Sequence, residues 1–247
     1  MSEERSEKLR NLYDTCKALI LDSSHVVEEV EKYRLDFKPP RTSVVILAES
    51  HAHTTQKEFR RLLKDNFRHY DGSRCRYVNY VYCIGNSESY ALEREYPTRR
   101  RTSQYWRILY SCLHQVSNNS DFHEFEGGES KDRVGRKQEL IRNLKNNGIW
   151  LLDSSLIGVN ILAAETRKQI IGICWETWLK DLISQLKNEG LLCVMTVGAS
   201  VHEMLSQDLK EMGLAIVKLD QPQNRLKGGY WKNYKRIYDA CERYGLK

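Results

Sequence analysis

Four short runs of consecutive apolar residues mark the expected strands of a sheet along this chain. They cover residues 43–48, 149–152, 191–197 and 214–217. Strands that are apolar on both faces are typical of a parallel sheet covered by helices on each side. Gly148, Gly190 and Gly213 directly precede the last three runs, at the position where a helix commonly ends in a left-handed residue.

Apolar residues at helical spacing fill the intervals between these runs. The pattern is clearest over residues 134–147, 176–187 and 201–212. Two further helices are predicted within residues 1–40, where Pro39 and Pro40 end the second. Strands that alternate with helices form βαβ units. The chain is therefore predicted to be one α/β domain, a three-layer α/β/α fold with a short, mostly parallel four-stranded central sheet.

Two segments depart from this alternation. Residues 117–133 are polar and contain a glycine pair, which predicts a loop. Residues 77–83 are apolar and rich in tyrosine and valine, so they are a candidate extra strand.

The composition is that of an ordinary folded protein. Hydrophobic residues make up 40% and charged residues 29% of the 247 residues, and no apolar run approaches the roughly 20 residues that cross a bilayer. The seven cysteines lack the C-x-x-C spacing of zinc or iron–sulfur sites. With a charged start to the chain that does not resemble a secretion signal, these features predict a reduced, cytoplasmic or nuclear protein. We expect it not to be secreted or membrane-associated, and to need no metal or other cofactor.

The formal net charge of +6 is compatible with a polyanionic partner. Basic residues form two clusters: Arg94 with Arg99, Arg100 and Arg101, and Lys227 with Lys232, Lys235 and Arg236. Either cluster can contact phosphates, although a solvated helix face carries the same kind of residue. We expect DNA as a partner, bound with weak to moderate, salt-sensitive affinity.

Polar residues follow each of the four apolar runs. They are Glu49, Ser50, His51 and His53 after the first, Asp153, Ser154 and Ser155 after the second, Ser200 after the third, and Gln221, Asn224 and Arg225 after the fourth. Because the carboxyl ends of parallel strands meet at one edge, these side chains should converge on one cleft. The serines and Asp153 also suit helix N-caps. Capping needs one polar side chain, so it does not account for Glu49, His51 and His53 together.

The order of these motifs resembles that of the uracil-DNA glycosylase superfamily. The stretch L-A-E-S-H-A-H at 47–53 lies where the family has its first motif, G-Q-D-P-Y-H or G-E-A-P-G. The stretch at 140–160 resembles the family's G-V-L-L-L-N-x-x-L-T-V segment, and C-W-E-T-W at 174–178 resembles its G-W-x-x-F-T helix start.

Two later segments extend the resemblance, which spans residues 44–238. C-V-M-T-V-G-A at 193–199 resembles the family's third strand and glycine turn. Q-P-Q at 221–223, followed by G-G-Y at 228–230, lies where the family has H-P-S and a glycine–aromatic pair. The resemblance implies the family's fold and its activity, which is hydrolysis of the N-glycosidic bond of a damaged or deaminated base.

The resemblance also implies roles for particular residues. Glu49 would stabilise the cationic sugar and orient water, while Gln221, His51 or His53 would stabilise the departing base. Asp153 would read the edge of the base, with Ser50 and His51 beside it. The residues expected to contact the nucleic-acid backbone are Arg99, Arg100, Arg101, Ser200, Asn224 and Arg225. Candidate platforms for stacking the base are Tyr80, Tyr82, Tyr105 and Trp106.

The sequence departs from the family at chemically important positions. His51 replaces the proline of the first motif, and Ser50 replaces its aspartate. Asp153 replaces the base-reading asparagine, and Gln221 replaces the histidine of the last motif. An ionised aspartate only accepts hydrogen bonds, so we expect a base that presents N–H or amino groups in place of uracil.

Two other interpretations of the sequence remain open. The H-x-H of His51 and His53 after a strand is similar to the opening motif of polymerase-and-histidinol-phosphatase-type hydrolases, because alternate residues of an extended segment can share a metal. The changes at Asp153 and Gln221 are also those expected in a non-catalytic member of the glycosylase fold, one that binds nucleic acid or a protein.

Overall fold

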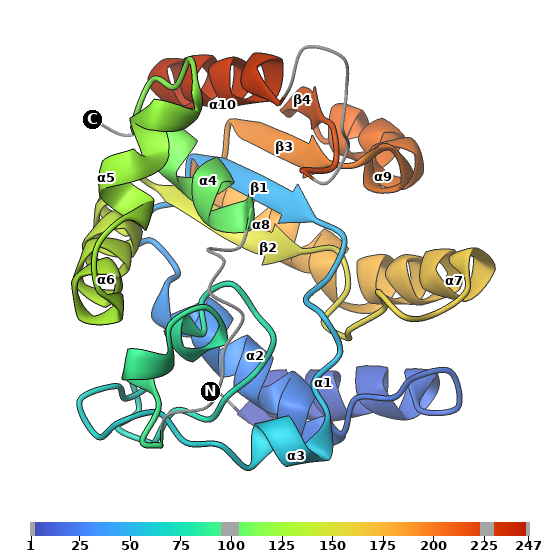
Figure 1. Cartoon of the computed structure of the whole chain (residues 1–247). Coiled ribbons are helices and arrows are strands. Elements are labelled where there is room, and N and C mark those ends of the chain that lie inside the picture. Colours follow the sequence, from blue (N-terminus) through green and yellow to red (C-terminus); the bar gives the residue numbers. More distant parts are fainter. Residues whose placement is uncertain (1–2, 95–103, 223–229, 246–247) are drawn as a thin grey trace.

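The computed structural model describes residues 3–94, 104–222 and 230–245. Its four strands are β1 (Val44–Ala48), β2 (Ile149–Asp153), β3 (Cys193–Val197) and β4 (Ala215–Leu219). They form one parallel sheet in the order β2-β1-β3-β4 (Figure 1). The prediction of a four-stranded parallel sheet is therefore confirmed. The predicted backbone contacts Arg99, Arg100, Arg101, Asn224 and Arg225 lie outside the described residues.

Burial explains why the apolar runs form this sheet. Every residue of β1, β2 and β3 is buried, as expected for strands covered on both faces. Edge strand β4 is more exposed, and Lys218 on it faces solvent. At the other edge, the backbone N–H of Leu151 in β2 donates to the hydroxyl of Tyr82 at 2.9 Å, so a side chain takes the place of a further strand.

Helices cover both faces of the sheet (Figure 1). On one face lie α4 (Gln104–Ser111), α6 (Ser130–Asn146) and α10 (Trp231–Tyr244), and on the other lie α8 (Lys180–Glu189) and α9 (Ala199–Glu211). Helix α1 (Glu3–Cys16) packs against α2 (Ser24–Asp36), α7 (Ala164–Cys174) and the π-helical turn η4 (Trp175–Leu179). The remaining short helices are α3 (Gln56–Phe59), η1 (Ile84–Asn86), η2 (Ser89–Ala91), η3 (Asn119–Phe122) and α5 (His123–Glu126).

One cluster of buried apolar side chains runs through the described residues, from Leu9 in α1 to Cys241 in α10. All seven cysteines are free and buried, where a thiol packs as a small apolar group. Gly148, Gly190 and Gly213 have positive φ and end the helices before β2, β3 and β4, as predicted. In the part of the chain that the structure describes, no helix has the length and apolarity to cross a bilayer.

Residues 117–133 are not the predicted loop, because they form η3, α5 and the start of α6. Asn118 and Asp121 make a capping box that starts η3. The rings of Phe122 and Phe125 are buried, and that of Phe122 packs edge-on against Tyr234 of α10 with centroids 5.3 Å apart. Two such short helices bury only a few apolar residues each, too few to give a helical period in the sequence.

Two other local predictions are wrong. Residues 77–83 are turns rather than a strand, and their backbone groups bond to a loop: the N–H of Asn79 donates to Thr54 Oγ1 at 2.8 Å, and its carbonyl accepts from the N–H of Ala52 at 3.1 Å. The stretch at 174–178 does not start a helix, because α7, η4 and α8 follow one another without a break.

Candidate active site

A cavity of about 640 Å³ opens at the carboxyl edge of the sheet. Residues that follow all four strands line it: Glu49, Ser50 and His51 after β1, Asp153 at the end of β2, Ala199 and Ser200 after β3, and Gln221 after β4. Asn79, Tyr80, Val81, Asn86, Tyr105, Asn160 and Arg167 complete much of the wall. The strand ends thus converge on one cavity, as expected, while the roles of these residues stay predictions.

His53 was expected in this cavity, but it is not among the described residues that line it. Its ring turns to Asp22 in the loop between α1 and α2, and Nδ1 lies 2.6 Å from Asp22 Oδ1. Its backbone N–H donates to Asn160 Oδ1 at 2.8 Å. The ring of His53 is therefore held against Asp22 and does not line the cavity.

Asp22 holds His51, His53 and the loop at Gly158 together, although nothing near it in the sequence marks it as a site residue. Its carboxylate accepts from the backbone N–H of Gly158 at 2.7 Å and of Thr54 at 3.2 Å, besides His51 and His53. A Cβ at Gly158 would lie 2.8 Å from Asp22 Oδ2 and 2.9 Å from His53 N, so only glycine fits there. Burial would raise the pKa of Asp22, but the hydrogen bonds from His51, Gly158 and Thr54 lower it below its usual value. Directly before a helix, an aspartate is typical of capping, so the sequence held no signal for this role.

His51 joins Asp22 to Asp153 at the floor of the cavity. Its Nε2 lies 3.0 Å from Asp22 Oδ2, and its Nδ1 lies 3.7 Å from Asp153 Oδ2. Burial disfavours a charged ring, but interaction with Asp153 and Asp22 outweighs it and raises the pKa of His51 to about 9. The ring is therefore an imidazolium at neutral pH, with a carboxylate on either side.

Three buried polar atoms at this floor have no hydrogen-bond partner among the described residues. They are His51 Nδ1, Asp153 Oδ2 and the hydroxyl of Tyr80. At 3.7 Å the first two form an ion pair that is too long for a hydrogen bond. Burial raises the pKa of Tyr80 well above its usual value, so its hydroxyl stays neutral and can donate or accept. Unsatisfied buried groups beside a cavity are typical of a site that binds a ligand or ordered water.

Glu49, directly after β1, lines the same cavity and is more exposed than His51 and Asp153. Its side chain is 18% exposed and pairs with Arg167, whose Nη1 lies 3.8 Å from Glu49 Oε2. Its backbone carbonyl accepts from Ser154 Oγ at 2.8 Å and from Ser155 N at 3.1 Å, which fixes the loop after β1 against the loop after β2. The carboxylate is thus held near the cavity while it stays accessible.

None of the residues expected as helix caps at the strand ends has that role. The N-cap of α7 is Ala163, ten positions after Asp153, and the N-cap of α9 is Gly198. Ser154 and Ser155 bond within the loop after β2, and Ser200 lies inside α9. The capping interpretation of Asp153 is therefore wrong as well.

Gln221 can pack in the cavity wall because Gly198 has no side chain. The φ of Gly198, 97°, is a conformation that other residues rarely adopt, and a Cβ there would lie 2.5 Å from Gln221 Nε2. Of the candidate stacking residues, Tyr80 and Tyr105 line the cavity, whereas Tyr82 and Trp106 do not. Burial raises the pKa of Tyr105 too, with Asp153 and Glu49 adding to the effect.

The H-x-H pair does not form a metal-ligand set in the described part of the chain. Both rings direct a nitrogen at the Asp22 carboxylate. Across residues 3–94, 104–222 and 230–245, no group of three or more His, Cys, Asp or Glu side chains is arranged to hold a metal ion. The sheet is also open rather than closed into a barrel. In the described structure, His51 and His53 are therefore partners of the Asp22 carboxylate rather than the predicted pair of metal ligands.

Within the predicted basic clusters, the described members lie on the surface. Arg94 is exposed, as are Lys232, Lys235 and Arg236 along α10, and Lys235 is paired with Asp239 at 3.0 Å. The opposite side of α10 is buried in the core.

The fold and this cavity define an α/β protein with a candidate ligand site, lined by carboxylates and other polar groups, at the carboxyl edge of a parallel sheet. No protein-family model matches the chain, and no curated protein is significantly similar to it. Its function therefore has to be argued from the chemistry of the cavity.

Proposed function

We propose that this chain is a DNA glycosylase-like enzyme of the uracil-DNA glycosylase kind, which hydrolyses the N-glycosidic bond of a damaged or deaminated base other than uracil. The observation that supports this proposal is the meeting of Glu49, Asp153 and Gln221, from three separate strand ends, in one cavity of about 640 Å³. A cavity of this size is in the range of sites for small ligands, so it can admit one flipped nucleotide.

Glu49 suits the role of the carboxylate beside the sugar. Cleavage of the bond develops positive charge on the sugar ring, which a nearby carboxylate stabilises. Because Glu49 is partly exposed and only loosely paired with Arg167, it can also orient a water molecule for attack at the same carbon.

Asp153 suits the role of the group that reads the base. Beside the imidazolium of His51 it is an acceptor, and its Oδ2 has no hydrogen-bond partner. A base with an N–H or amino group on its pairing edge would donate to this oxygen, whereas O4 of uracil would oppose it as a second acceptor. Tyr80 and Tyr105 provide rings against which the base can lie.

The departing base carries negative charge, which needs a donor or a cation. Gln221 offers an amide N–H, and His51 offers the nearest positive charge of the floor. A fixed cation in a water-poor pocket stabilises developing negative charge more than it would in water.

The test is a panel of oligonucleotides, each with one damaged or deaminated base, in single- and double-stranded form. We expect the wild type to release a base that has N–H or amino donors, such as hypoxanthine or a cytosine derivative. Glu49→Gln keeps the shape and removes the charge, and should lower the rate by at least about 100-fold for every base. Glu176→Gln, an exposed glutamate paired with Lys180, is the matched control and should leave the rate unchanged.

Asp153→Asn should shift the preference toward uracil. Comparable release of uracil by the wild type and Asp153→Asn would contradict the role of Asp153. Binding of the oligonucleotides without release of any base would instead identify the chain as a non-catalytic member of this fold.

A further inference from the structure

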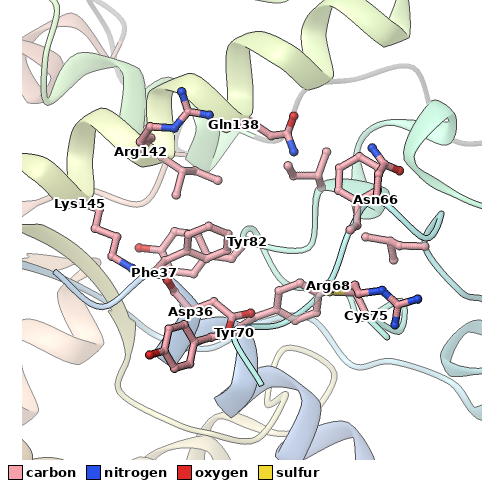
Figure 2. Close-up of a pocket in the computed structure, with 15 residues that line it drawn as sticks. Asp36, Phe37, Asn66, Arg68, Tyr70, Cys75, Tyr82, Gln138, Arg142 and Lys145 are labelled. Atoms are coloured by element: carbon pink, nitrogen blue, oxygen red, sulfur yellow. Dashed lines mark hydrogen bonds between the residues drawn. The ribbon is translucent and has the colours of Figure 1, made fainter. Parts of the chain in front are cut away.

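A second cavity of about 370 Å³ lies between α2, α6 and the segment from Leu63 to Ile84 (Figure 2). It shares no lining residue with the first cavity. The ends of α2 and α6 that line it lead into the amino ends of β1 and β2, whereas the first cavity lies at the carboxyl ends. Nothing in the proposed reaction uses this space.

The inner wall of the second cavity is aromatic and aliphatic. The rings of Phe37 and Tyr82 lie side by side in Figure 2, with centroids 4.8 Å apart and planes inclined by 41°. Leu63, Phe67, Ile84 and Ile141 extend this wall. Such a surface takes up the flat apolar part of a ligand.

The rim carries positive charge that no carboxylate of the rim neutralises. In Figure 2, Gln138, Arg142 and Lys145 descend from α6 on one side of the cavity. Lys145 Nζ donates to the backbone carbonyl of Asp36 at 2.8 Å, not to a carboxylate. Arg142 is exposed and has no hydrogen bond or ion pair with any residue that the structure describes.

Among the described lining residues, Asp36 supplies the one carboxylate, and this group already has hydrogen-bond donors. It accepts from His69 Nδ1 at 2.5 Å and from the backbone N–H of Tyr70 at 2.8 Å. Burial opposes a charge on His69, but its hydrogen bonds, including those to Asp36 and Glu29, raise its pKa to about 11, so Asp36 faces a permanent cation. Arg68, across the cavity, is held by Asp65 and by the carbonyl of Gly72. Arg142 and Lys145 are therefore the charges that a ligand would meet.

We propose that the second cavity binds a small organic anion with one or two rings, whose carboxylate or sulfonate lies at Arg142 and Lys145 and whose rings lie against Phe37 and Tyr82. The positive charges of Arg142 and Lys145 favour an anionic group at one end of the ligand, and the aromatic wall favours rings at the other end. A guanidinium suits such an anion because it can donate two parallel hydrogen bonds.

A pair of fluorescent probes tests both halves of this proposal. 1-Anilinonaphthalene-8-sulfonate is an aromatic anion, and N-phenyl-1-naphthylamine has the same rings without the sulfonate. We expect the anion to bind one site per chain and the neutral probe to bind more weakly. Arg142→Gln should lower the affinity for the anionic probe by about tenfold, which is the size of one charge-assisted contact, and leave the affinity for the neutral probe unchanged. Gln138→Trp, at the exposed rim, should fill the cavity and exclude both.

Lys131→Gln is the matched control, because it removes one exposed positive charge from the same helix at a position that does not line the cavity. Equal affinity of the anion for Arg142→Gln and Lys131→Gln would overturn the proposal, as would binding that survives Gln138→Trp. The wild type could also sediment as a dimer that the substitution Gln138→Trp dissociates. That outcome would assign this surface to a second copy of the chain and would also overturn the proposal. None of these outcomes depends on base release, so the result is separate from that at the first cavity.

Discussion

Replacing Asp22 with asparagine tests whether a buried carboxylate holds the floor of the first cavity together. Asp22 accepts from His51 at 3.0 Å, His53 at 2.6 Å, Gly158 at 2.7 Å and Thr54 at 3.2 Å. An asparagine has one acceptor oxygen in place of two, and its amino group would face donors. Removing one partner of a buried ion pair costs about 3–5 kcal/mol, so we expect the free energy of unfolding near pH 6 to fall by about that amount.

The loss should depend on pH because His51 titrates. Burial disfavours its charged form, yet Asp153 and Asp22 raise its pKa from 6.5 to about 9, which corresponds to about 3 kcal/mol of stability for the protonated ring. That contribution is fully present below pH 6.5 and disappears as the pH rises through 9. In Asp22→Asn the ring keeps only Asp153, so the contribution is smaller from the start. The difference in stability between wild type and variant should therefore narrow by about 2 kcal/mol between about pH 6 and about pH 10.

Urea unfolding followed by tryptophan fluorescence at the two pH values measures this difference. His69 also has a raised pKa, but it titrates alike in both proteins and cancels in the comparison. Asp14→Asn is the control, since it removes an exposed aspartate of α1 that pairs with the exposed Lys17, and it should change stability little at either pH. An equal difference between wild type and Asp22→Asn at both pH values would refute the coupling of Asp22 to a charged His51.

Two further changes test the cavity wall and the DNA partner. Gly198→Ala should lower the free energy of unfolding by about 1–3 kcal/mol and displace Gln221, because Gly198 has a φ of 97° and a Cβ there would meet Gln221 Nε2. Denaturant titrations measure this loss. Gly172→Ala is the control and should show no loss of stability, because Gly172 lies in a helix with open space around it. DNA affinity measured over a range of salt concentrations should fall as salt rises, and alanine at 99–101 should weaken it and flatten its salt dependence; an unchanged slope would mean that these arginines do not contact phosphates.

The sheet could be predicted from the sequence because each buried strand is a run of consecutive apolar residues. Strands buried on both faces must be apolar at consecutive positions, and β1, β2 and β3 are buried at every residue. Strand β4 lies at an edge of the sheet and is only half-buried, but its first residues are also consecutive apolar residues, so it could be predicted too. Because all the strands are parallel, the same pattern also located the edge at which Glu49, Asp153 and Gln221 meet.

The errors arose where distant contacts decide the structure. The segment at 77–83 has the composition of a strand, but its backbone bonds to the loop at 52–54, and Tyr80 lines the first cavity whereas Tyr82 lines the second. Asp22 lies 29 positions from His51 and 136 from Gly158, and nothing near it in the sequence distinguishes it from a helix cap. His53 was misplaced for the same reason, because its partner was unknown.

The floor of the first cavity shows how Asp153 can stay buried beside a charged ring. A carboxylate buried without a cation would be protonated or would destabilise the fold. Here His51 lies between Asp153 and Asp22, with ring nitrogens 3.7 Å and 3.0 Å from their carboxylate oxygens, so each buried carboxylate has a cationic partner. Asp153→Asn leaves His51 paired with Asp22 and removes no helix cap, since α7 begins only at Ala164. A change of base preference in that variant would therefore report the hydrogen-bonding polarity of residue 153 rather than a disturbed fold.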